Sequence, residues 1–264
     1  MLELVDIRKD FNAGTPDCVT LFNGFNFSVK DGEFVSVIGS NGSGKTTLLN
    51  LVCGSIAPDS GKIIFDGRDI TNVCEYKRAD FIGRVFQNPS MGTCPELTIT
   101  ENMALADNKG KKFGLTRAVN KKRVSYYREL VSQCGMGLEN RMNVKVGALS
   151  GGQRQALALV IANMTDIKLL ILDEHTAALD PKTSENIMRL TDKMVREKGI
   201  TTLMVTHNLR FAAEYGTRLV MMHEGECIMD ISGEEKKKLT VEDLLRKFEV
   251  VAGEEFSSDK ALLA

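Results

Sequence analysis

The sequence of 264 residues has almost no net charge and no long run of apolar side chains. Its 34 basic and 35 acidic residues leave a formal charge of −1, which excludes a chain-wide attraction to nucleic acid or lipid as the basis of function. The longest unbroken apolar run, Ala156–Ala162, falls far short of the roughly 20 residues that cross a bilayer. The first residues lack the basic and apolar pattern of a secretory signal, so we expect a cytoplasmic protein.

Cysteine and histidine are also sparse. The three histidines and six cysteines make a structural metal site unexpected, because no two cysteines have the two-residue gap that zinc and redox sites use. In a cytoplasmic protein, scattered cysteines are typical of reduced thiols. These positions are Cys18, Cys53, Cys74, Cys94, Cys134 and Cys227.

Short apolar runs alternate with helical patterns along most of the chain. Runs typical of strands buried on both faces are Phe34–Ile38, Ile82–Phe86, Leu169–Leu172, Thr201–Val205 and Leu219–Met222. Between them, Ser184–Lys198 has the apolar period of a helix. This alternation predicts an α/β fold with a mostly parallel sheet. The early strands Leu2–Ile7, Phe25–Val29 and Lys62–Phe65 predict a small added antiparallel sheet.

Two other regions have a distinct character. Pro95–Ile161 contains no strong strand candidate and is predicted to be mainly helical. Within it, Lys109–Arg128 carries eight basic residues and no acidic one, which indicates a solvated helix face or, alternatively, a contact with an anionic membrane surface. Near the C-terminus a helix is expected to begin at Thr240, and the residues after Gly253 are expected to be loosely held.

The motif that decides the chemistry is Gly39–Thr46, which matches G-x-x-x-x-G-K-[ST] between an apolar strand and a helix. Its glycines let successive backbone N–H groups point at phosphate oxygens, and the helix start adds partial positive charge. Lys45 supplies a full charge to the β- and γ-phosphates, and the Thr46 hydroxyl is a ligand for Mg²⁺. The sequence therefore predicts a phosphate-binding P-loop.

Two further motifs extend this site. Leu169–Glu174 is an apolar strand that ends in two carboxylates, of which Asp173 is placed to hold the Mg²⁺ shell and Glu174 to polarise the attacking water. Leu149–Gln153 precedes a helical segment, and its serine and free N–H groups make a second anion site. Because a nucleotide has one γ-phosphate, two such sites are understandable if each serves a different nucleotide across a dimer.

With these motifs in this order, the chain resembles the ATP-binding cassette family over at least residues 2–230. Gly39–Thr46 resembles the Walker A loop, Leu149–Gln153 the signature and Leu169–Glu174 the Walker B strand. Gln87 resembles the Q-loop glutamine, Asp180 the D-loop aspartate and His207 the switch histidine, whereas Phe11 sits where the family has an adenine-stacking aromatic. His175 and His223 are expected to be ordinary structural histidines.

The resemblance implies a single P-loop NTPase domain over residues 1–264, with a helical subdomain at about 90–160 and a C-terminal tail at about 233–264. It implies a head-to-tail homodimer that binds two ATP molecules with Mg²⁺. The expected catalytic residues are Glu174, His207, Gln87 and Lys45, and the expected metal ligands are Thr46, Gln87 and Asp173. The expected ATP-binding residues are Phe11, Gly39, Ser40, Asn41, Gly42, Ser43, Gly44, Lys45, Thr46, Thr47, Ser150, Gly151, Gly152, Gln153 and Asp180.

The implied partners are a second copy of the chain, separate transmembrane permease subunits and, indirectly, a substrate-binding lipoprotein, which places the chain on the cytoplasmic face of a bacterial membrane. Two departures from the family pattern are His175 in place of the usual proline and the segment Gln155–Ala162 after the signature. Together with Gly92-Thr93 and Pro95–Asn102, they resemble the bacterial importers proposed for tryptophan, tyrosine or related solutes. An exporter and a soluble non-transport ATPase stay open as alternatives. The short Gln87–Ser150 interval argues against the inserted coiled coil of a DNA-repair cassette.

Overall fold

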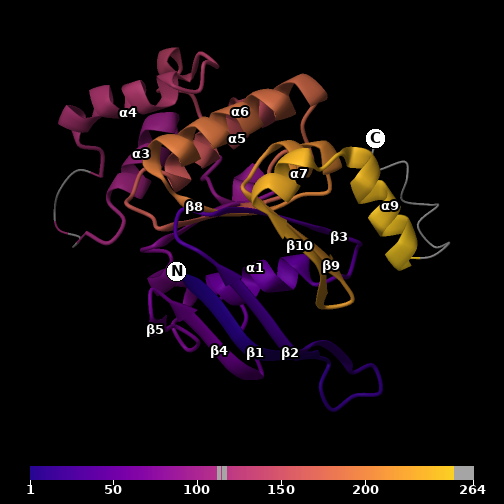
Figure 1. The fold of residues 1–264 in the computed structure, drawn as a ribbon. Helices are drawn as coiled ribbons and strands as arrows, with labels where there is room; N and C mark the ends of the chain where they lie inside the picture. The colour runs from indigo at the N-terminus through magenta and orange to yellow at the C-terminus, as the bar shows by residue number, and fades with distance from the viewer. Residues whose placement is uncertain (112–113, 115–117, 253–264) are drawn as a thin grey trace. The chain divides into compact units, whose positions relative to one another are not determined.

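The computed structural model describes residues 1–111, 114 and 118–252, which fall into two compact units (Figure 1). The first unit combines Met1–Ala79 with Gly199–Ala264, and the second is Asp80–Lys198. Within the described ranges, no helix is both long enough and apolar enough to span a membrane.

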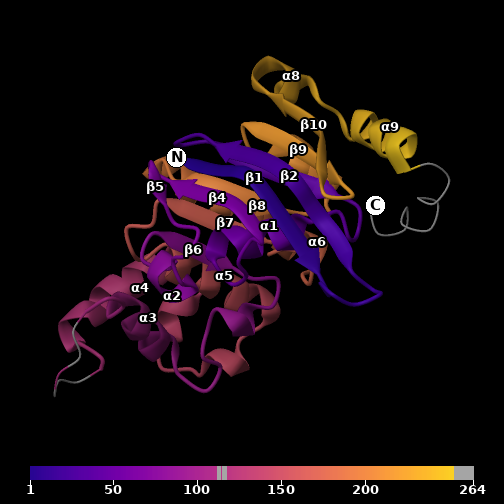
Figure 2. The same ribbon diagram turned by 90° about the horizontal axis from the view of Figure 1, so that it is seen from below.

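The first unit begins with a small antiparallel sheet, as predicted. Its strands run in the order β2 (Val19–Val29), β1 (Leu2–Phe11), β4 (Ser60–Phe65) and β5 (Arg68–Asp69), and Figure 2 shows the first three side by side. The inward positions of β2 are Phe25, Phe27 and Val29, all buried, which gives the alternation expected of a sheet with one solvated face.

A second sheet of the first unit carries the P-loop strand at its centre. Strand β3 (Phe34–Gly39) pairs in parallel with β8 (Thr201–Val205) on one side and with β9 (Arg218–His223) on the other. β3 and β8 are buried along their whole length, in agreement with their apolar sequences. The strand β10 (Glu226–Ser232) pairs antiparallel with β9 and was not predicted, because most of its residues are exposed and its longest apolar run is the three residues Cys227–Met229.

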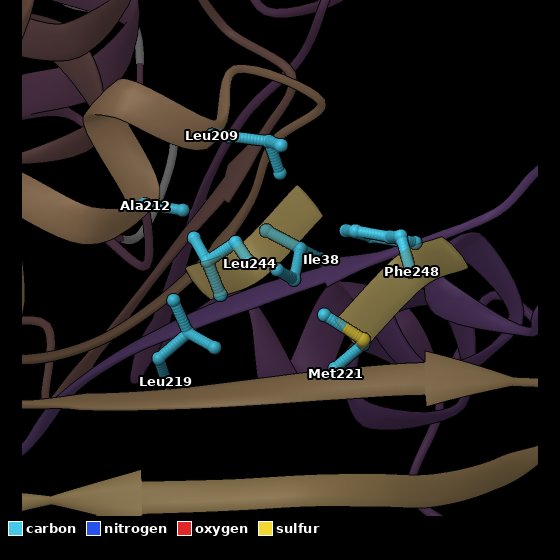
Figure 3. Close-up of a cluster of buried hydrophobic side chains, with 7 residues drawn as sticks. All are labelled: Ile38, Leu209, Ala212, Leu219, Met221, Leu244 and Phe248. Carbon is cyan, nitrogen blue, oxygen red and sulfur yellow. The ribbon is translucent and has the colours of Figure 1, made fainter. Parts of the chain in front are cut away.

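The described part of this unit contains the helices α1 (Lys45–Cys53), α2 (Glu75–Arg78), α7 (Leu209–Glu214), α8 (Gly233–Lys238) and α9 (Val241–Ala252). Helix α9 begins where predicted, since the Thr240 hydroxyl accepts from the Asp243 N–H at 3.2 Å. Figure 3 shows how α9 is held: Leu244 and Phe248 pack on Ile38 of β3 and on residues of α7 and β9. The C-terminal helix therefore covers the strand that leads into the P-loop.

The second unit contains the parallel strand pair β6 (Ile82–Val85) and β7 (Leu169–Asp173). Its helices are α3 (Ile99–Asp107), α4 (Val124–Ser132), α5 (Gly151–Ala162) and α6 (Pro181–Lys198), with short 3-10 turns at Pro89–Met91, Lys121–Arg123, Leu138–Asn140 and Val146–Ala148. The prediction that Pro95–Ile161 is mainly helical is confirmed among its described residues.

The basic segment Lys109–Arg128 is anchored to an acid that precedes it. Arg123 donates two hydrogen bonds to the carboxylate of Asp107, at 2.8 Å each, and Tyr127 donates a third at 2.7 Å. This network lowers the pKa of Asp107 to about 2. Residues 112–113 and 115–117 of the segment, and the tail after 252, lie outside the described residues.

All six cysteines are free thiols, and Cys53 is buried. Among the residues that the structure describes, no three histidine, cysteine or acidic side chains are grouped as a metal would require.

Candidate functional site

The P-loop turns from β3 into α1 through residues that need unusual backbone angles. Gly39, Gly42 and Gly44 all have positive φ, at 155°, 77° and 102°. At Gly39 an added Cβ would overlap the carbonyl oxygen of Met222, and at Gly44 it would lie 2.9 Å from the Phe22 ring. The loop therefore requires glycine at both positions for its backbone angle and for its close packing.

Helix α1 begins at Lys45 with features that suit an anion. Its N-cap is Gly44, which has no side chain to occupy the first N–H groups, and its first turn contains no acidic residue. The Lys45 ammonium lies across the loop and donates to the carbonyl oxygens of Gly39 at 2.9 Å and Ser40 at 2.8 Å. The Lys45 ammonium group therefore lies at the loop, where phosphate oxygens could replace the carbonyl oxygens of Gly39 and Ser40 as its acceptors.

Parallel pairing brings His207 to the same edge as the P-loop. Val37 of β3 is opposite Val205 of β8, so both strands end at one edge of the sheet. His207 follows two residues after β8, and Asn208 caps α7 by accepting the Phe211 N–H at 3.0 Å. The predicted switch histidine is therefore fixed between a buried strand and a capped helix.

The end of β9 and the turn after it also support the loop, a contact that was not predicted. His223, expected to be an ordinary structural residue, has its Nδ1 3.4 Å from the Ser40 hydroxyl. Gly225 donates its N–H to the Ser43 carbonyl at 3.1 Å. The only available signal was that His223 directly follows the apolar run Leu219–Met222, which puts it at the carboxyl end of a strand.

Phe11 lies at the end of β1, paired with Val19 of β2. Its side chain is 38% exposed and that of Val19 is 57% exposed. Two neighbouring apolar side chains at a strand end provide a surface on which a planar ring could stack.

In the second unit, Gln87 and the two predicted carboxylates lie where the paired strands β6 and β7 end. Val85 is opposite Leu172, so the residues that follow them, Gln87 on one strand and Asp173 and Glu174 on the other, leave the sheet at one edge. Glu174 has a φ of 46°, a left-handed conformation that is uncommon for a non-glycine residue and often accompanies a functional role. Asp173 is paired with Arg84 at 2.7 Å, a residue that sequence reasoning passed over.

The signature segment forms the N-terminus of α5, as predicted. Ser150 is the N-cap, and its hydroxyl accepts the Gln153 N–H at 3.3 Å while the Gln153 side chain accepts the Ser150 N–H at 3.2 Å. The predicted D-loop aspartate caps the next helix in the same way, because Asp180 accepts the Thr183 N–H at 3.1 Å. This hydrogen bonding with Thr183 lowers the pKa of the Asp180 carboxyl.

Close packing joins these two helix starts. An added Cβ at Gly152 would overlap the Thr183 methyl group, and one at Gly151 would lie 3.5 Å from Leu179, which precedes Asp180. The structure therefore brings the signature and the D-loop residue together within the second unit.

His175 is a core residue, as predicted. It is 2% exposed, and its Nε2 lies 3.3 Å from the Thr191 hydroxyl of α6. Burial lowers the pKa of its imidazole to about 4, so it is neutral at physiological pH. Its role is to fix the segment after Glu174 against α6.

Each unit thus offers a helix start suited to an anion, α1 in the first and α5 in the second. Asp173 at the end of β7 and Glu174 after it are carboxylates, a chemistry suited to binding a cation and polarising water. The family model described as ABC transporter matches residues 22–177. Over 249 residues the chain is 49% identical to the tyrosine transport ATP-binding protein of Clostridioides difficile (strain R20291), covering 94% of this chain and 99% of that protein.

A second relative is the spermidine/putrescine import ATP-binding protein PotA of Haemophilus influenzae (strain ATCC 51907 / DSM 11121 / KW20 / Rd), which is 36% identical over 235 residues that cover 89% of this chain and 59% of the relative. Among solved structures, the fold is similar to the dimeric post-hydrolysis state of the ATP-binding cassette MJ0796 bound to ADP and Pi. The TM-score is 0.75 at 30% identity, covering 88% of this chain and 98% of that one.

Proposed function

Because the chain belongs to the ABC transporter family, as its ATP-binding subunit, we propose that it drives the import of a small organic solute such as an aromatic amino acid. Its predicted fold class, a P-loop NTPase cassette with an added antiparallel sheet, is confirmed by the cassette structures that it resembles. Membership of this family makes it an ATPase that binds ATP and ADP.

The observation that carries the proposal is the pair of helix starts. The P-loop at α1 and the signature at α5 each present N–H groups to an anion, and one nucleotide has a single γ-phosphate. In a head-to-tail dimer, Ser150 and Gly152 of one copy would reach the γ-phosphate that Lys45 of the other copy holds. The dimeric MJ0796 cassette supports this arrangement.

Within such a site, each residue has a role that suits its chemistry. Glu174 acts as the general base on the attacking water, and His207 contacts the γ-phosphate. Phe11 stacks on adenine. Asp180 couples the two sites, and Gln87 relays their state to the permease.

A Mg²⁺ ion is expected with the nucleotide, and the side chains fit it. The Asp173 carboxylate, the Thr46 hydroxyl and the Gln87 amide are oxygen donors, which this cation prefers. Bound Mg²⁺ supplies positive charge that stabilises the transferred phosphate.

The import of an aromatic amino acid is supported by the 49% identical relative, whose name describes tyrosine transport. The ATP-binding subunit does not itself select the solute. A separate transmembrane permease at the cytoplasmic face of the membrane, fed by a substrate-binding lipoprotein, would do so.

The first test is the mass in solution of the Glu174→Gln chain with and without Mg-ATP. This variant keeps the site but lacks the base, so we expect ATP to convert a monomer to a stable dimer. A matched control adds Ser150→Arg, which fills the signature and should keep the chain monomeric. A Glu174→Gln chain that stays monomeric, both alone and with its permease in detergent, would contradict the shared site.

The second test addresses the solute and its direction. The chain is reconstituted in vesicles with its cognate permease and binding protein, and uptake of labelled tyrosine is compared with that of labelled spermidine. We expect ATP-dependent uptake of tyrosine alone. Uptake of spermidine instead would show that the solute is a polyamine and not an aromatic amino acid. ATP-dependent efflux would identify an exporter.

A further inference from the structure

Arg84 lies inside a strand that is otherwise apolar, and its side chain contacts Asp173, the Walker B aspartate. On β6, Arg84 is opposite Ile171 of β7. Because side chains alternate along a strand, Asp173, two residues after Ile171, points to the same face as Arg84. The Arg84 Nη2 donates to the Asp173 Oδ2 at 2.7 Å.

This ion pair is largely shielded from water. The side chains of Arg84 and Asp173 are 12% and 14% exposed, so solvent screens their attraction less than it would on an open surface. By comparison, the ion pair of Arg189 and Glu185 in the same unit is 65% and 36% exposed. The Arg84–Asp173 pair is therefore a strong local charge interaction at the end of β7.

The guanidinium is also held from its other side. Its central carbon lies 4.7 Å from the centroid of the Phe86 ring, a cation–π distance. The Phe86 carbonyl in turn accepts a hydrogen bond from the Gln155 side chain of α5 at 3.0 Å. Arg84 thus stays beside Asp173 without depending on that carboxylate alone.

We propose that Arg84 competes with Mg²⁺ for Asp173 and thereby sets the Mg²⁺ concentration that nucleotide binding requires. Both are cations that seek the same carboxylate, and a carboxylate paired with a guanidinium offers less negative potential to a second cation. This inference rests on the proposed function, because it takes Asp173 to be the carboxylate that serves the metal.

The test measures the affinity of the full chain for a fluorescent ADP analogue as Mg²⁺ is varied from micromolar to millimolar, so hydrolysis is not needed. Arg84→Met removes the charge but keeps a long side chain over Phe86. Mg²⁺ is expected to raise the affinity for the analogue in both chains. In Arg84→Met we expect the Mg²⁺ concentration that gives half of this increase to be roughly tenfold lower than in the wild type, and the affinity without Mg²⁺, measured in EDTA, to be unchanged. Arg189→Met is the matched control and should behave as the wild type.

Arg84→Lys is measured in parallel, since it keeps a cation but loses the planar guanidinium, and we expect a smaller shift in the same direction. If Arg84→Met needs as much Mg²⁺ as the wild type, or more, the proposal is wrong. If Arg84→Met does not fold, an unchanged or increased Mg²⁺ requirement in Arg84→Lys overturns the proposal instead. A wild-type chain that binds no nucleotide would instead overturn the proposed function. The two failures are therefore distinguishable.

Discussion

Gly152 of the signature helix lies directly against Thr183 at the start of α6, where an added Cβ would overlap the Thr183 Cγ2 methyl group. The Thr183 side chain is β-branched, which restricts its escape to another rotamer. The Thr183 N–H is bonded to Asp180, so a shift of this residue would also disturb the cap of α6.

We therefore expect Gly152→Ala to lower the free energy of unfolding by about 1–3 kcal/mol, the usual effect of overpacking. Urea denaturation measures it. Gly151→Ala is the matched control, because its Cβ would meet Leu179 at an ordinary 3.5 Å and stability should change little. Adding Thr183→Ser to Gly152→Ala removes the obstructing methyl group and should restore most of the loss; equal effects at the two glycines would refute this packing argument.

Arg78 gives a second prediction, because it is a buried cation that donates hydrogen bonds to five backbone carbonyl groups. It is 1% exposed and donates, at 2.7–3.0 Å, to the carbonyl groups of Leu51, Val52, Ile70, Thr71 and Val73. Two of these carbonyls belong to the last turn of α1, so Arg78 caps the helix that begins at the P-loop.

Arg78→Met leaves those carbonyl oxygens buried without this donor, and we expect a loss of roughly 3–5 kcal/mol in the free energy of unfolding. Chemical denaturation followed by circular dichroism measures the loss. The exposed Arg189→Met should change stability by about 0.5 kcal/mol or less. A loss at Arg78 as small as that of the control would show that water replaces the guanidinium.

The strands that position the site were predictable because their sequences are buried on both faces. The runs Phe34–Ile38 and Thr201–Val205 are strands, as predicted. Because these strands pair in parallel, His207 lies at the same edge of the sheet as the P-loop. Strand β10 was missed because it is an exposed edge strand whose longest apolar run, Cys227–Met229, has only three residues.

The missed contacts of the site depend on register and long-range packing. Arg84 belongs to the run Ile82–Phe86, which was predicted to be a strand buried on both faces, and its pairing with Asp173 requires knowing that it lies opposite Ile171. The approach of His223 to Ser40 depends in the same way on the pairing of β3 with β9. Local sequence patterns specify the strands but not which strands become neighbours.

His175 predicts a specific dependence of stability on pH. Burial lowers the pKa of its imidazole from 6.5 to about 4, so the unfolded chain takes up this proton first as pH falls. The stabilising contribution is complete above pH 6.5 and is lost as pH falls from 6.5 towards 4, by up to about 3 kcal/mol. We expect His175→Gln to reduce this loss, as measured by urea denaturation at a series of pH values.

Thr191→Val tests whether burial or the contact with the Thr191 hydroxyl lowers the pKa of His175. It removes the hydroxyl 3.3 Å from the His175 Nε2 but leaves the imidazole buried. Since burial is what lowers the pKa, this variant should keep the wild-type dependence on pH between 6.5 and 4. A flattened profile in Thr191→Val would attribute the effect to the hydrogen bond instead.

The shared site can be tested by complementation between two inactive chains. Lys45→Ala disables every P-loop and Ser150→Arg disables every signature, so neither homodimer should hydrolyse ATP. A mixed dimer has one intact site, made from the P-loop of the Ser150→Arg chain and the signature of the Lys45→Ala chain. Random mixing makes half of the dimers mixed, so we expect about a quarter of wild-type activity if the sites act independently.

A mixture of Lys45→Ala with Lys45→Met lacks an intact P-loop and should stay inactive. If subunit exchange is verified by mass and the first mixture is no more active than its parents, the prediction of one independent, shared site in the mixed dimer is wrong.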